Sequence, residues 1–369
     1  MTKSFVHLHA HTEYSMLDGA AKIVDYLKKV KELNQPAAAI TDHGNLYGAM
    51  EFVQKANDLG IKPIIGYEAY ITPGSRFDRP DRENNKRYHL TLLAENNIGY
   101  QNLVELVSKA YTEGYYYKPR IDYELLDQHH DGLIALSGCL GGELAQHLAP
   151  DGSVEEGNTS NERSFEKALD IAKKYQSIFG KENYFIEIHN HGIKQQLDIL
   201  DDLVEIAELI DAPLVAANDS HYVEENGAEA HDALLCVQTN RTLDDESRFR
   251  FDGSGYYVKS AEEMRKLFPE DKYPGACDNT LAIANRVNYE FNFDNSYLPD
   301  FPIEDKNVSP EELLKIKVYE GGEHKYGTLT SEIIERIDYE LDVINSMGFA
   351  SYFLIVGDLI EFSKKRNIR

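Results

Sequence analysis

The sequence predicts an α/β protein built as a seven-unit (β/α) barrel, and three observations support this fold class. Short apolar runs recur over the first 217 residues, helical patterns stand between several of them, and polar residues follow most of the runs. Alternation of strand and helix is typical of a mostly parallel sheet, and seven apolar strands favour a closed barrel over an open sheet. Such a barrel carries its chemistry at the rim where the strands end.

The expected strands are short and bounded by polar or turn-forming residues. They cover residues 5–8, 37–41, 63–71, 89–93, 133–136, 184–188 and 213–217. Apolar residues spaced three and four apart predict helices over residues 23–30 and 165–178.

Two polar segments mark an exposed loop and a connector. Residues 150–161 are rich in turn-forming residues, and residues 292–309 precede a new run of helical patterns. We expect a domain boundary near residue 288, with residues 1–288 as the barrel domain and residues 289–369 as the start of a second domain.

Composition excludes several classes of protein. The 369 residues are 42% hydrophobic and 27% charged, which is ordinary for a globular protein. The first residues lack the apolar core of a signal peptide, and the sequence has no run of about 18 apolar residues, so we expect a cytoplasmic protein without a membrane partner. The odd number of cysteines, three, disfavours a disulfide framework.

The net charge of −25 argues against a basic nucleic-acid-binding protein, because such proteins bind phosphates through Lys and Arg. If the substrate is DNA, bound divalent metals have to supply positive charge locally. Carboxylate and imidazole side chains are the ligands that hold such ions.

The first apolar run ends in two histidines with one residue between them. Strand side chains repeat with a period of two, so His9 and His11 point to the same side and can chelate one ion. Asp18 follows seven residues later. It is either a further ligand or the N-cap of the helix that contains Ile23 and Tyr26.

The second and third runs supply the next candidates. Asp42 and Gly44 fit a turn, in which the carboxylate bonds backbone amides and the glycine takes a positive φ, so His43 has no structural task. Glu68 stands inside an apolar run, where a charged carboxylate is costly to bury unless it is paired or metal-bound. His89 begins its run, and an antiparallel fourth strand would bring it beside Glu68.

Polar residues also follow the last three runs. Cys139 comes after the fifth run, and Glu187 and His189 stand at the end of the sixth. Asp219 and His221 follow the seventh with the same one-residue spacing as the first histidine pair. A lone cysteine is more often a small buried hydrophobe, so only the company of the other residues makes Cys139 a ligand candidate.

Together these runs provide more ligands than one ion can use. With three or four ligands each, some of them bridging, they suit three divalent ions. The candidate ligands are His9, His11, Asp18, His43, Glu68, His89, Cys139, Asp219 and His221.

The chemistry of this ligand set indicates the metal and the reaction. Five imidazoles with a thiolate favour zinc, while the carboxylates also accept manganese or iron. The ligands carry about −4 against +6 from three ions, so the pocket attracts phosphate. Neighbouring metal ions generate hydroxide and neutralise the phosphoryl and leaving oxygens, so we expect phosphoester hydrolysis by a metal-bound hydroxide, without a separate side-chain nucleophile.

Seven segments of the sequence resemble a known family, the polymerase and histidinol phosphatase (PHP) domain of the bacterial DNA polymerase III alpha subunit. The resemblance runs nearly the whole length, and its segments are HLHAHTEYSMLDGA, TDHGNLYG, IKPIIGYEAYI, HLTLLAENNIGYQNL, GYYYKPRID, LSGCLGGE and NDSHY. It implies a seven-unit barrel, a trinuclear site and 3′ to 5′ exonuclease proofreading. By resemblance, one metal is held by His9, His11, Glu68 and Asp219, a second by Glu68, His89 and Cys139, and a third by Asp18, His43 and His221.

The same resemblance extends to the last part of the chain. Residues 339–369 look like the opening helices of the polymerase palm, and the catalytic aspartates of that family would lie beyond residue 369. We therefore expect this chain not to polymerise DNA, whereas the full-length protein would be a DNA-directed DNA polymerase. The implied partners are the primer 3′ end, the remainder of the alpha chain, and the sliding clamp and other replisome subunits through the full-length protein.

Residues that contact DNA stay unassigned. One group forms a basic but mixed-charge loop, and the other interleaves aromatics with cations in a way that could stack bases and meet phosphates. An ordinary solvated loop and a packed aromatic turn are the favoured explanations. The two groups are Arg76, Arg79, Arg82, Lys86 and Arg87, and Tyr115, Tyr116, Tyr117, Lys118 and Arg120.

Two other functions remain open beside the exonuclease. The domain could bind metals only to hold a polymerase together, or it could be a phosphatase for a small phosphate monoester. The complete ligand set argues against the first alternative, and the palm-like tail argues against the second.

Overall fold

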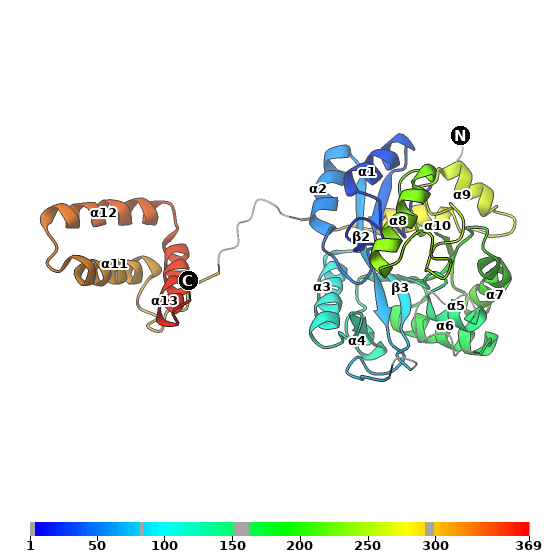
Figure 1. Ribbon diagram of the computed structural model, residues 1–369, viewed down its shortest axis with the longest axis horizontal. Coiled ribbons are helices and arrows are strands. Elements are labelled where there is room, and N and C mark those ends of the chain that lie inside the picture. Colours follow the sequence, from blue (N-terminus) through cyan, green and yellow to red (C-terminus); the bar gives the residue numbers. More distant parts are fainter. Residues whose placement is uncertain (1–3, 82–83, 151–161, 292–298, 369) are drawn as a thin grey trace. The chain divides into compact units, whose positions relative to one another are not determined.

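The computed structural model describes residues 4–81, 84–150, 162–291 and 299–368 (Figure 1). The chain divides into two compact units, Met1–Glu290 and Phe291–Arg369. The expected loop at 150–161 lies outside the described residues except for its first residue, and so does the part of the expected connector at 292–298.

The first unit is an α/β domain built on one curled sheet. Its main path runs through β1 (Ala37–Ile40), β2 (Lys62–Ile71), β3 (Tyr88–Ala94), β5 (Leu133–Leu136), β6 (Tyr184–Ile188) and β7 (Leu214–Ala216). The two-residue strand β4 (Arg120–Ile121) pairs with β2 beside this path. Six of the seven expected strands therefore form where the apolar runs predict them.

Strand β3 runs antiparallel to both of its neighbours, whereas the other strand pairs are parallel. Its register places His89 opposite Tyr70 and Thr91 opposite Glu68. The antiparallel fourth strand predicted from the position of His89 is confirmed.

The first expected strand, residues 5–8, does not form a regular strand, and here the prediction was wrong. The segment is nevertheless extended and bonds to both ends of the sheet. The amide of Ala39 in β1 donates to the carbonyl of His7 at 3.0 Å, and the amide of His11 donates to the carbonyl of Ser220, beyond β7, at 2.8 Å. These bonds close the curled sheet into a barrel.

Side-chain hydroxyls explain why this segment is not a regular strand. The amide of Val6 donates to Thr280 Oγ1 at 3.2 Å, and that of Ala10 donates to Thr41 Oγ1 at 2.8 Å. Both amides thus use a side chain instead of a backbone carbonyl, so the backbone ladder is interrupted.

Ten helices in the described part of the first unit surround the sheet (Figure 1). Because they cover the sheet, all residues of most strands are buried, as expected for a sheet with both faces covered. The helices are α1 (Ile23–Glu32), α2 (Ala49–Leu59), α3 (Asn97–Thr112), α4 (Tyr123–Gln128), α5 (Glu143–Leu148), α6 (Phe165–Phe179), α7 (Lys194–Ile210), α8 (Ala228–Thr239), α9 (Ala261–Leu267) and α10 (Asp278–Arg286).

The described part of the second unit consists of three helices, α11 (Pro310–Tyr326), α12 (Ser331–Ser346) and α13 (Ala350–Lys365). Helix α11 begins with a capping box between Ser309 and Glu312. Among the described residues, no single helix has the length and apolar character needed to cross a membrane, although α12 and α13, bent by 116°, meet that test as a pair.

A close backbone contact at Gly99 gives the fold its first testable prediction. A Cβ at this position in α3 would stand 1.8 Å from the carbonyl oxygen of Gly132, just before β5. Gly99→Ala is therefore expected to destabilise the protein by about 1–3 kcal/mol through overpacking. Urea unfolding measures the loss, and Gly357→Ala in α13, whose Cβ would meet nothing within 4 Å, is the control. An unchanged unfolding midpoint for Gly99→Ala would contradict the contact.

Candidate metal centre

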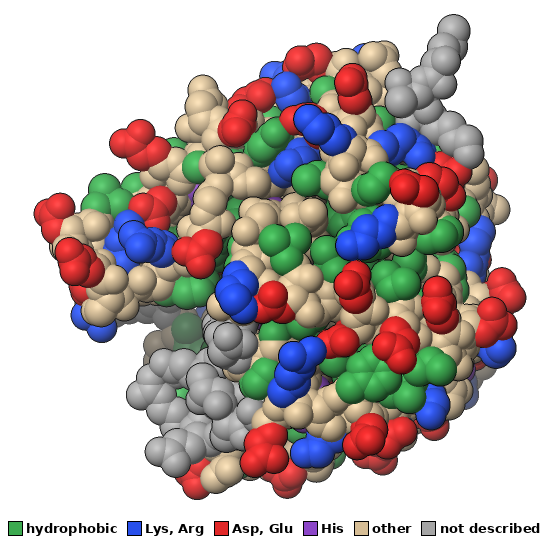
Figure 2. Space-filling model, turned by 90° about the vertical axis from the view of Figure 1, so that its right-hand side faces the viewer, with side chains coloured by type: hydrophobic (Ala, Val, Ile, Leu, Met, Phe, Trp, Pro, Cys, Tyr) green, Lys and Arg blue, Asp and Glu red, His purple; other side chains and the backbone are tan. Residues whose placement is uncertain are grey.

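All nine predicted ligands gather at one rim of the barrel. His9 and His11 are buried to 0% and 1% exposure, and the other seven line a cavity of about 630 Å³. On the face drawn in Figure 2 acidic and basic side chains are interspersed and little histidine is visible. The lining residues are Asp18, His43, Glu68, His89, Cys139, Asp219 and His221.

The deepest group joins the first and last segments of the barrel. His11 Nε2 lies 3.2 Å from Asp219 Oδ1 and 3.4 Å from Glu68 Oε2. His9 Nε2 lies 3.5 Å from the same Asp219 oxygen and 3.3 Å from Glu68 Oε1. Two imidazole nitrogens and two carboxylates therefore converge, which is a suitable donor set for a divalent transition metal.

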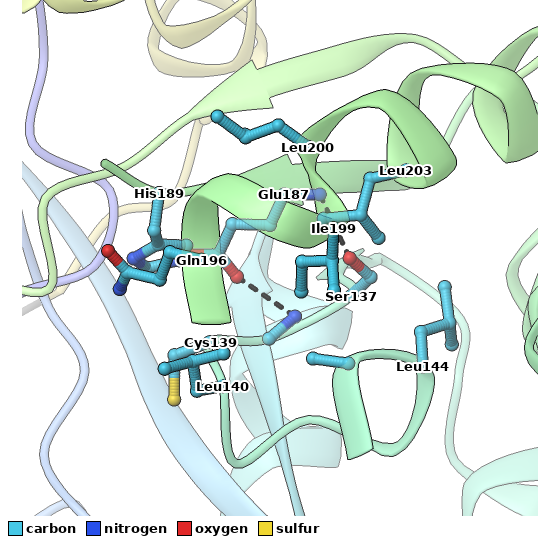
Figure 3. A pocket seen from close by; sticks show the side chains of 12 residues that line it. Ser137, Cys139, Leu140, Leu144, Glu187, His189, Gln196, Ile199, Leu200 and Leu203 are labelled. Atoms are coloured by element: carbon cyan, nitrogen blue, oxygen red, sulfur yellow. Dashed lines mark hydrogen bonds and ion pairs between the residues drawn. The ribbon is translucent and has the colours of Figure 1, made fainter. Parts of the chain in front are cut away.

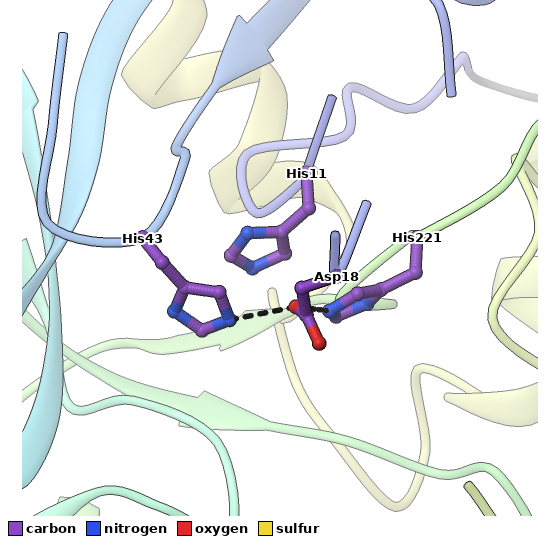
Figure 4. A group of neighbouring side chains, drawn as sticks. All are labelled: His11, Asp18, His43 and His221. Atoms are coloured by element: carbon purple, nitrogen blue, oxygen red, sulfur yellow. Dashed lines mark hydrogen bonds and ion pairs between the residues drawn. The ribbon is translucent and has the colours of Figure 1, made fainter. Parts of the chain in front are cut away.

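A second group surrounds Asp18 (Figure 4). Its Oδ2 lies 3.0 Å from His43 Nε2 and 3.0 Å from His221 Nε2, and His11 completes the cluster. The N-cap of α1 is Lys22, so the alternative of Asp18 as helix cap was wrong. The carboxylate instead points toward the imidazoles.

A third group forms where β2 and β3 lie side by side. His89 Nδ1 lies 3.1 Å from Glu68 Oε1, and Cys139 Sγ lies 3.5 Å from the same oxygen and 3.7 Å from His89 Nδ1. Glu68 also approaches His43 Nδ1 at 2.7 Å through its other oxygen. Glu68 thus lies at the centre of the cluster and touches members of all three groups.

Buried ligand atoms that form no regular hydrogen bond indicate that these residues fit bound metals. A buried polar atom without a partner costs about 1–3 kcal/mol, so such atoms are rare in folded proteins. Five gather here, and a divalent ion would satisfy each of them. Among the described residues, the buried ligand atoms that form no regular hydrogen bond are His9 Nε2, His11 Nε2, His43 Nδ1, Glu68 Oε2 and Asp219 Oδ1, and they approach one another only as ion pairs at 2.7–3.5 Å.

The second nitrogen of several imidazoles is already bonded, and this bond turns the free nitrogen toward the cluster. His9 Nδ1 lies 2.7 Å from Glu187 Oε1, and His11 Nδ1 lies 2.9 Å from Ser15 Oγ. His221 Nδ1 lies 2.8 Å from the carbonyl of Asp219. Partners of this kind orient metal-binding histidines and raise their basicity.

The charges of the cluster shift the pKa values of its side chains. Burial alone would lower the pKa of His9, but the carboxylates of Asp219, Glu187 and Glu68 outweigh it and raise that pKa well above its usual value. Burial would raise the pKa of Glu187, yet His9 and His189 lower it to about 2. Burial and Glu68 raise the pKa of the Cys139 thiol to about 11, a shift that a nearby divalent ion would reverse.

The turn after β1 has the positive φ at Gly44 that the sequence predicted, but Asp42 bonds the segment after His11 and not the amides of its own turn. Asp42 Oδ1 accepts the backbone amide of Thr12 at 2.6 Å and the hydroxyl of Ser15 at 2.7 Å, and Gly44 has a φ of 63°. Asp42 thereby fixes Ser15, which in turn contacts His11. The neighbouring His43 is left to face the cluster.

The sequence showed Glu187 and His189 at the end of a strand but did not place them in the site. Glu187 is fully buried, and its Oε2 accepts the amide of Gly138 at 3.0 Å (Figure 3). His189 Nε2 lies 3.0 Å from Glu187 Oε1. The signal that identified Glu68, a carboxylate inside an apolar run, is equally present at Glu187.

The two cation-rich groups are mainly structural. Arg76 pairs with Asp122 at 3.0 Å and with Glu113 at 2.7 Å, and Arg120 is fully buried and donates to backbone carbonyls. Arg82 lies outside the described residues. Of the nine described residues in these groups, only Lys118 lines the cavity that contains the predicted ligands. It lies beside Tyr70, whose hydroxyl accepts from its Nζ at 3.2 Å.

The contact between Glu187 and His9 yields a second prediction. Glu187→Gln is expected to weaken metal binding by about 10- to 100-fold, because the amide cannot support the imidazole as the carboxylate does. Titration of the metal-free protein with zinc measures the affinity. Glu143→Gln is the matched control, since Glu143 is equally buried but bonds Tyr175 at 2.8 Å, away from the cluster. Equal affinities in the two variants would contradict the role of Glu187.

The fold and this cluster define an α/β-barrel protein with a candidate metal centre at its rim. The chain belongs to the PHP domain family, because the family model described as "PHP domain" matches residues 7–191, which are half of the chain. A second model, described as "Bacterial DNA polymerase III alpha NTPase domain", matches residues 312–369, where the sequence suggested the start of a polymerase palm.

Curated relatives point to the same family. The chain is 43% identical to DNA polymerase III subunit alpha of Treponema pallidum over 366 residues, which are 99% of this chain and 30% of the relative. It is 44% identical over 383 residues to the Mycobacterium tuberculosis subunit, with 99% of this chain and 31% of the relative covered. The chain thus spans about a third of the length of these relatives.

A solved structure shows only a distant likeness. It is a two-domain protein from Bacteroides vulgatus, described as containing a predicted PHP-like metal-dependent phosphoesterase. The alignment covers 71% of this chain and 62% of that chain, with 13% identity and a TM-score of 0.33, which is too low to carry an argument.

Proposed function

We propose that this chain is a metal-dependent 3′ to 5′ exonuclease that removes nucleotides from a primer end and so proofreads DNA. The observation that carries the proposal is the convergence of nine ligand-type side chains in one cluster, seven of which line one cavity, with buried ligand atoms that form no regular hydrogen bond. Polynuclear sites of imidazole and carboxylate ligands serve hydrolysis of phosphate esters. The relatives named DNA polymerase III subunit alpha support DNA as the substrate.

The cofactor of the proposed site is a set of three divalent ions, with zinc favoured and manganese or iron also accepted by these ligands. The proposed assignment follows the three groups of side chains, with Glu68 shared between two of them. When bound, the ions supply Lewis acidity and activate water for attack on phosphorus. No separate side-chain nucleophile is proposed.

The protein's own residues prepare the site. Glu187 and Ser15 hold the imidazoles of His9 and His11, so the ligand atoms are fixed before metal binds. Glu68 is buried to 1% exposure, and the low dielectric constant around a buried carboxylate strengthens its interactions with cations.

The setting of this activity is a longer protein. We propose that the chain is part of a DNA polymerase III alpha subunit, in which the full-length protein is a DNA-directed DNA polymerase of the cytoplasm. Its proposed partners are the primer 3′ end, the remainder of the alpha chain, the sliding clamp and other replisome subunits.

Digestion of a 5′-labelled primer with a mismatched 3′ end tests the proposal. With zinc or manganese, the chain is expected to shorten the primer stepwise from its 3′ end. A chelator and His11→Ala should both abolish the shortening, while His324→Ala, at an exposed position of α11, should not.

Two outcomes would replace the proposal. Full metal occupancy without digestion of any DNA would favour a metal-binding structural module. Hydrolysis of p-nitrophenyl phosphate with no action on DNA would favour a small-molecule phosphomonoesterase.

A further inference from the structure

A loop segment between α8 and α9 forms one wall of the cavity that contains the predicted metal ligands. Phe249, Arg250 and Phe251 all line the cavity, although none of them belongs to the ligand set. The segment follows a salt bridge in which both guanidinium nitrogens of Arg248 contact the carboxylate of Asp232, at 2.5 and 2.6 Å. This two-pronged pair fixes the backbone on one side of the segment.

Aromatic packing fixes the other side of the segment. The ring of Phe251 lies 4.8 Å from that of the candidate ligand His221, 5.0 Å from that of His231 and 4.6 Å from that of Tyr256. These distances are typical of favourable aromatic pairs. Phe251 therefore packs the loop directly against the cluster of candidate metal ligands.

The two residues between these fixed points, Phe249 and Arg250, have side chains that remain accessible to solvent. The side chain of Phe249 remains 38% exposed, and its ring meets Phe251 edge-on at 5.7 Å. Arg250 is exposed and makes no hydrogen bond or ion pair with any residue that the structure describes. The loop, fixed on both sides, thus exposes an aromatic ring and a guanidinium group to the cavity.

The chemistry of this wall suits a nucleotide. An accessible ring stacks on a base, and a guanidinium binds phosphate through paired hydrogen bonds. Lys118 lines the same cavity and adds positive charge, whereas Asp252 adds one carboxylate to those of the candidate ligands Asp18, Glu68 and Asp219. The volume of about 630 Å³ falls within the range of small-ligand sites and is large enough for one nucleotide.

We propose that Phe249 and Arg250 bind the last nucleotide of a single-stranded nucleic-acid 3′ end. The terminal base stacks on Phe249, and Arg250 pairs with a backbone phosphate beside the metal centre. This inference rests on the proposed exonuclease function and adds the substrate class, an unpaired 3′ terminus, and two residues that position it.

Equilibrium binding tests the inference without depending on hydrolysis. The probe is a fluorescent oligonucleotide whose 3′ linkages are phosphorothioates that resist digestion, compared with the same strand lacking only its terminal base. In manganese, the wild-type chain is expected to bind the intact strand about 10-fold more tightly, in keeping with base stacking on an aromatic ring. Digestion of an unmodified strand tests the proposed function separately.

The variants give the decisive comparison. Phe249→Ala should bring the preference for the terminal base close to one, and Arg250→Ala should weaken both probes about equally and flatten the salt dependence of binding. Phe353→Ala, with a similarly exposed ring on α13, should behave as wild type. The inference is overturned if Phe249→Ala keeps the tenfold preference, if the wild type shows none, or if Arg250→Ala binds both probes normally.

Discussion

Glu68→Gln is expected to lower the rate of DNA hydrolysis by about a thousandfold or more. The Glu68 carboxylate approaches His43 Nδ1 at 2.7 Å and His89 Nδ1 at 3.1 Å, and it also contacts the deepest group. A glutamine keeps the shape but removes the charge that would bridge two ions. Loss of metal-based charge stabilisation is worth several kcal/mol, and each 1.36 kcal/mol is about a factor of ten in rate.

The effect is measured as kcat/KM on a labelled primer, beside circular dichroism to verify the fold. Glu143→Gln removes an equally buried carboxylate that bonds Tyr175, and it should keep nearly full activity. If Glu68→Gln stayed within about tenfold of the wild type, Glu68 would not be a metal ligand for this reaction.

Removal of the metals is the second large effect, and it acts on stability. Without cations, the buried carboxylates of Asp18, Glu68 and Asp219 are balanced only by imidazoles at 2.7–3.5 Å. An ion at 100 times its dissociation constant contributes about 2.7 kcal/mol, so three ions contribute about 8 kcal/mol. We expect the melting temperature to fall by about 15 °C or more after chelation.

Differential scanning calorimetry before and after chelation measures this change, and added zinc should restore the original transition. Glu68→Gln should show a much smaller response to the chelator than the wild type. If neither the chelator nor added zinc changed the melting temperature, the cluster would be stable without metal.

Much of the fold could be predicted because apolar runs of strand length are strong local signals. The antiparallel strand β3 was predicted from chemistry, since that direction brings His89, at the start of its run, beside Glu68. The first run, residues 5–8, was misread as a regular strand because apolar character does not reveal partners. There the hydroxyls of Thr41 and Thr280 replace backbone carbonyls, and both are distant in sequence.

The candidate site was predictable where ligands recur at one-residue spacing after a strand. The structure brings these pairs, His9 with His11 and Asp219 with His221, into one cluster. The role of Asp18 was ambiguous because an acidic residue before a helix can be either an N-cap or a metal ligand. Its contacts with His43 and His221, which are distant in sequence, favour the role of a ligand.

The wall formed by Phe249 and Arg250 could not be predicted. The segment has no regular structure and therefore no periodicity, and its place beside His221 depends on packing of Phe251 across more than twenty residues of chain. Loop residues that carry function often lack a local signal of this kind.

The most direct test of the central claim is a titration of the metal-free chain with zinc or manganese, with exonuclease activity and bound metal measured on the same samples. The account predicts that activity rises with bound metal and levels off near three ions per chain, and that His11→Ala binds fewer ions and stays inactive. Activity that is independent of bound metal, or that levels off at one ion, would contradict a trinuclear hydrolytic centre.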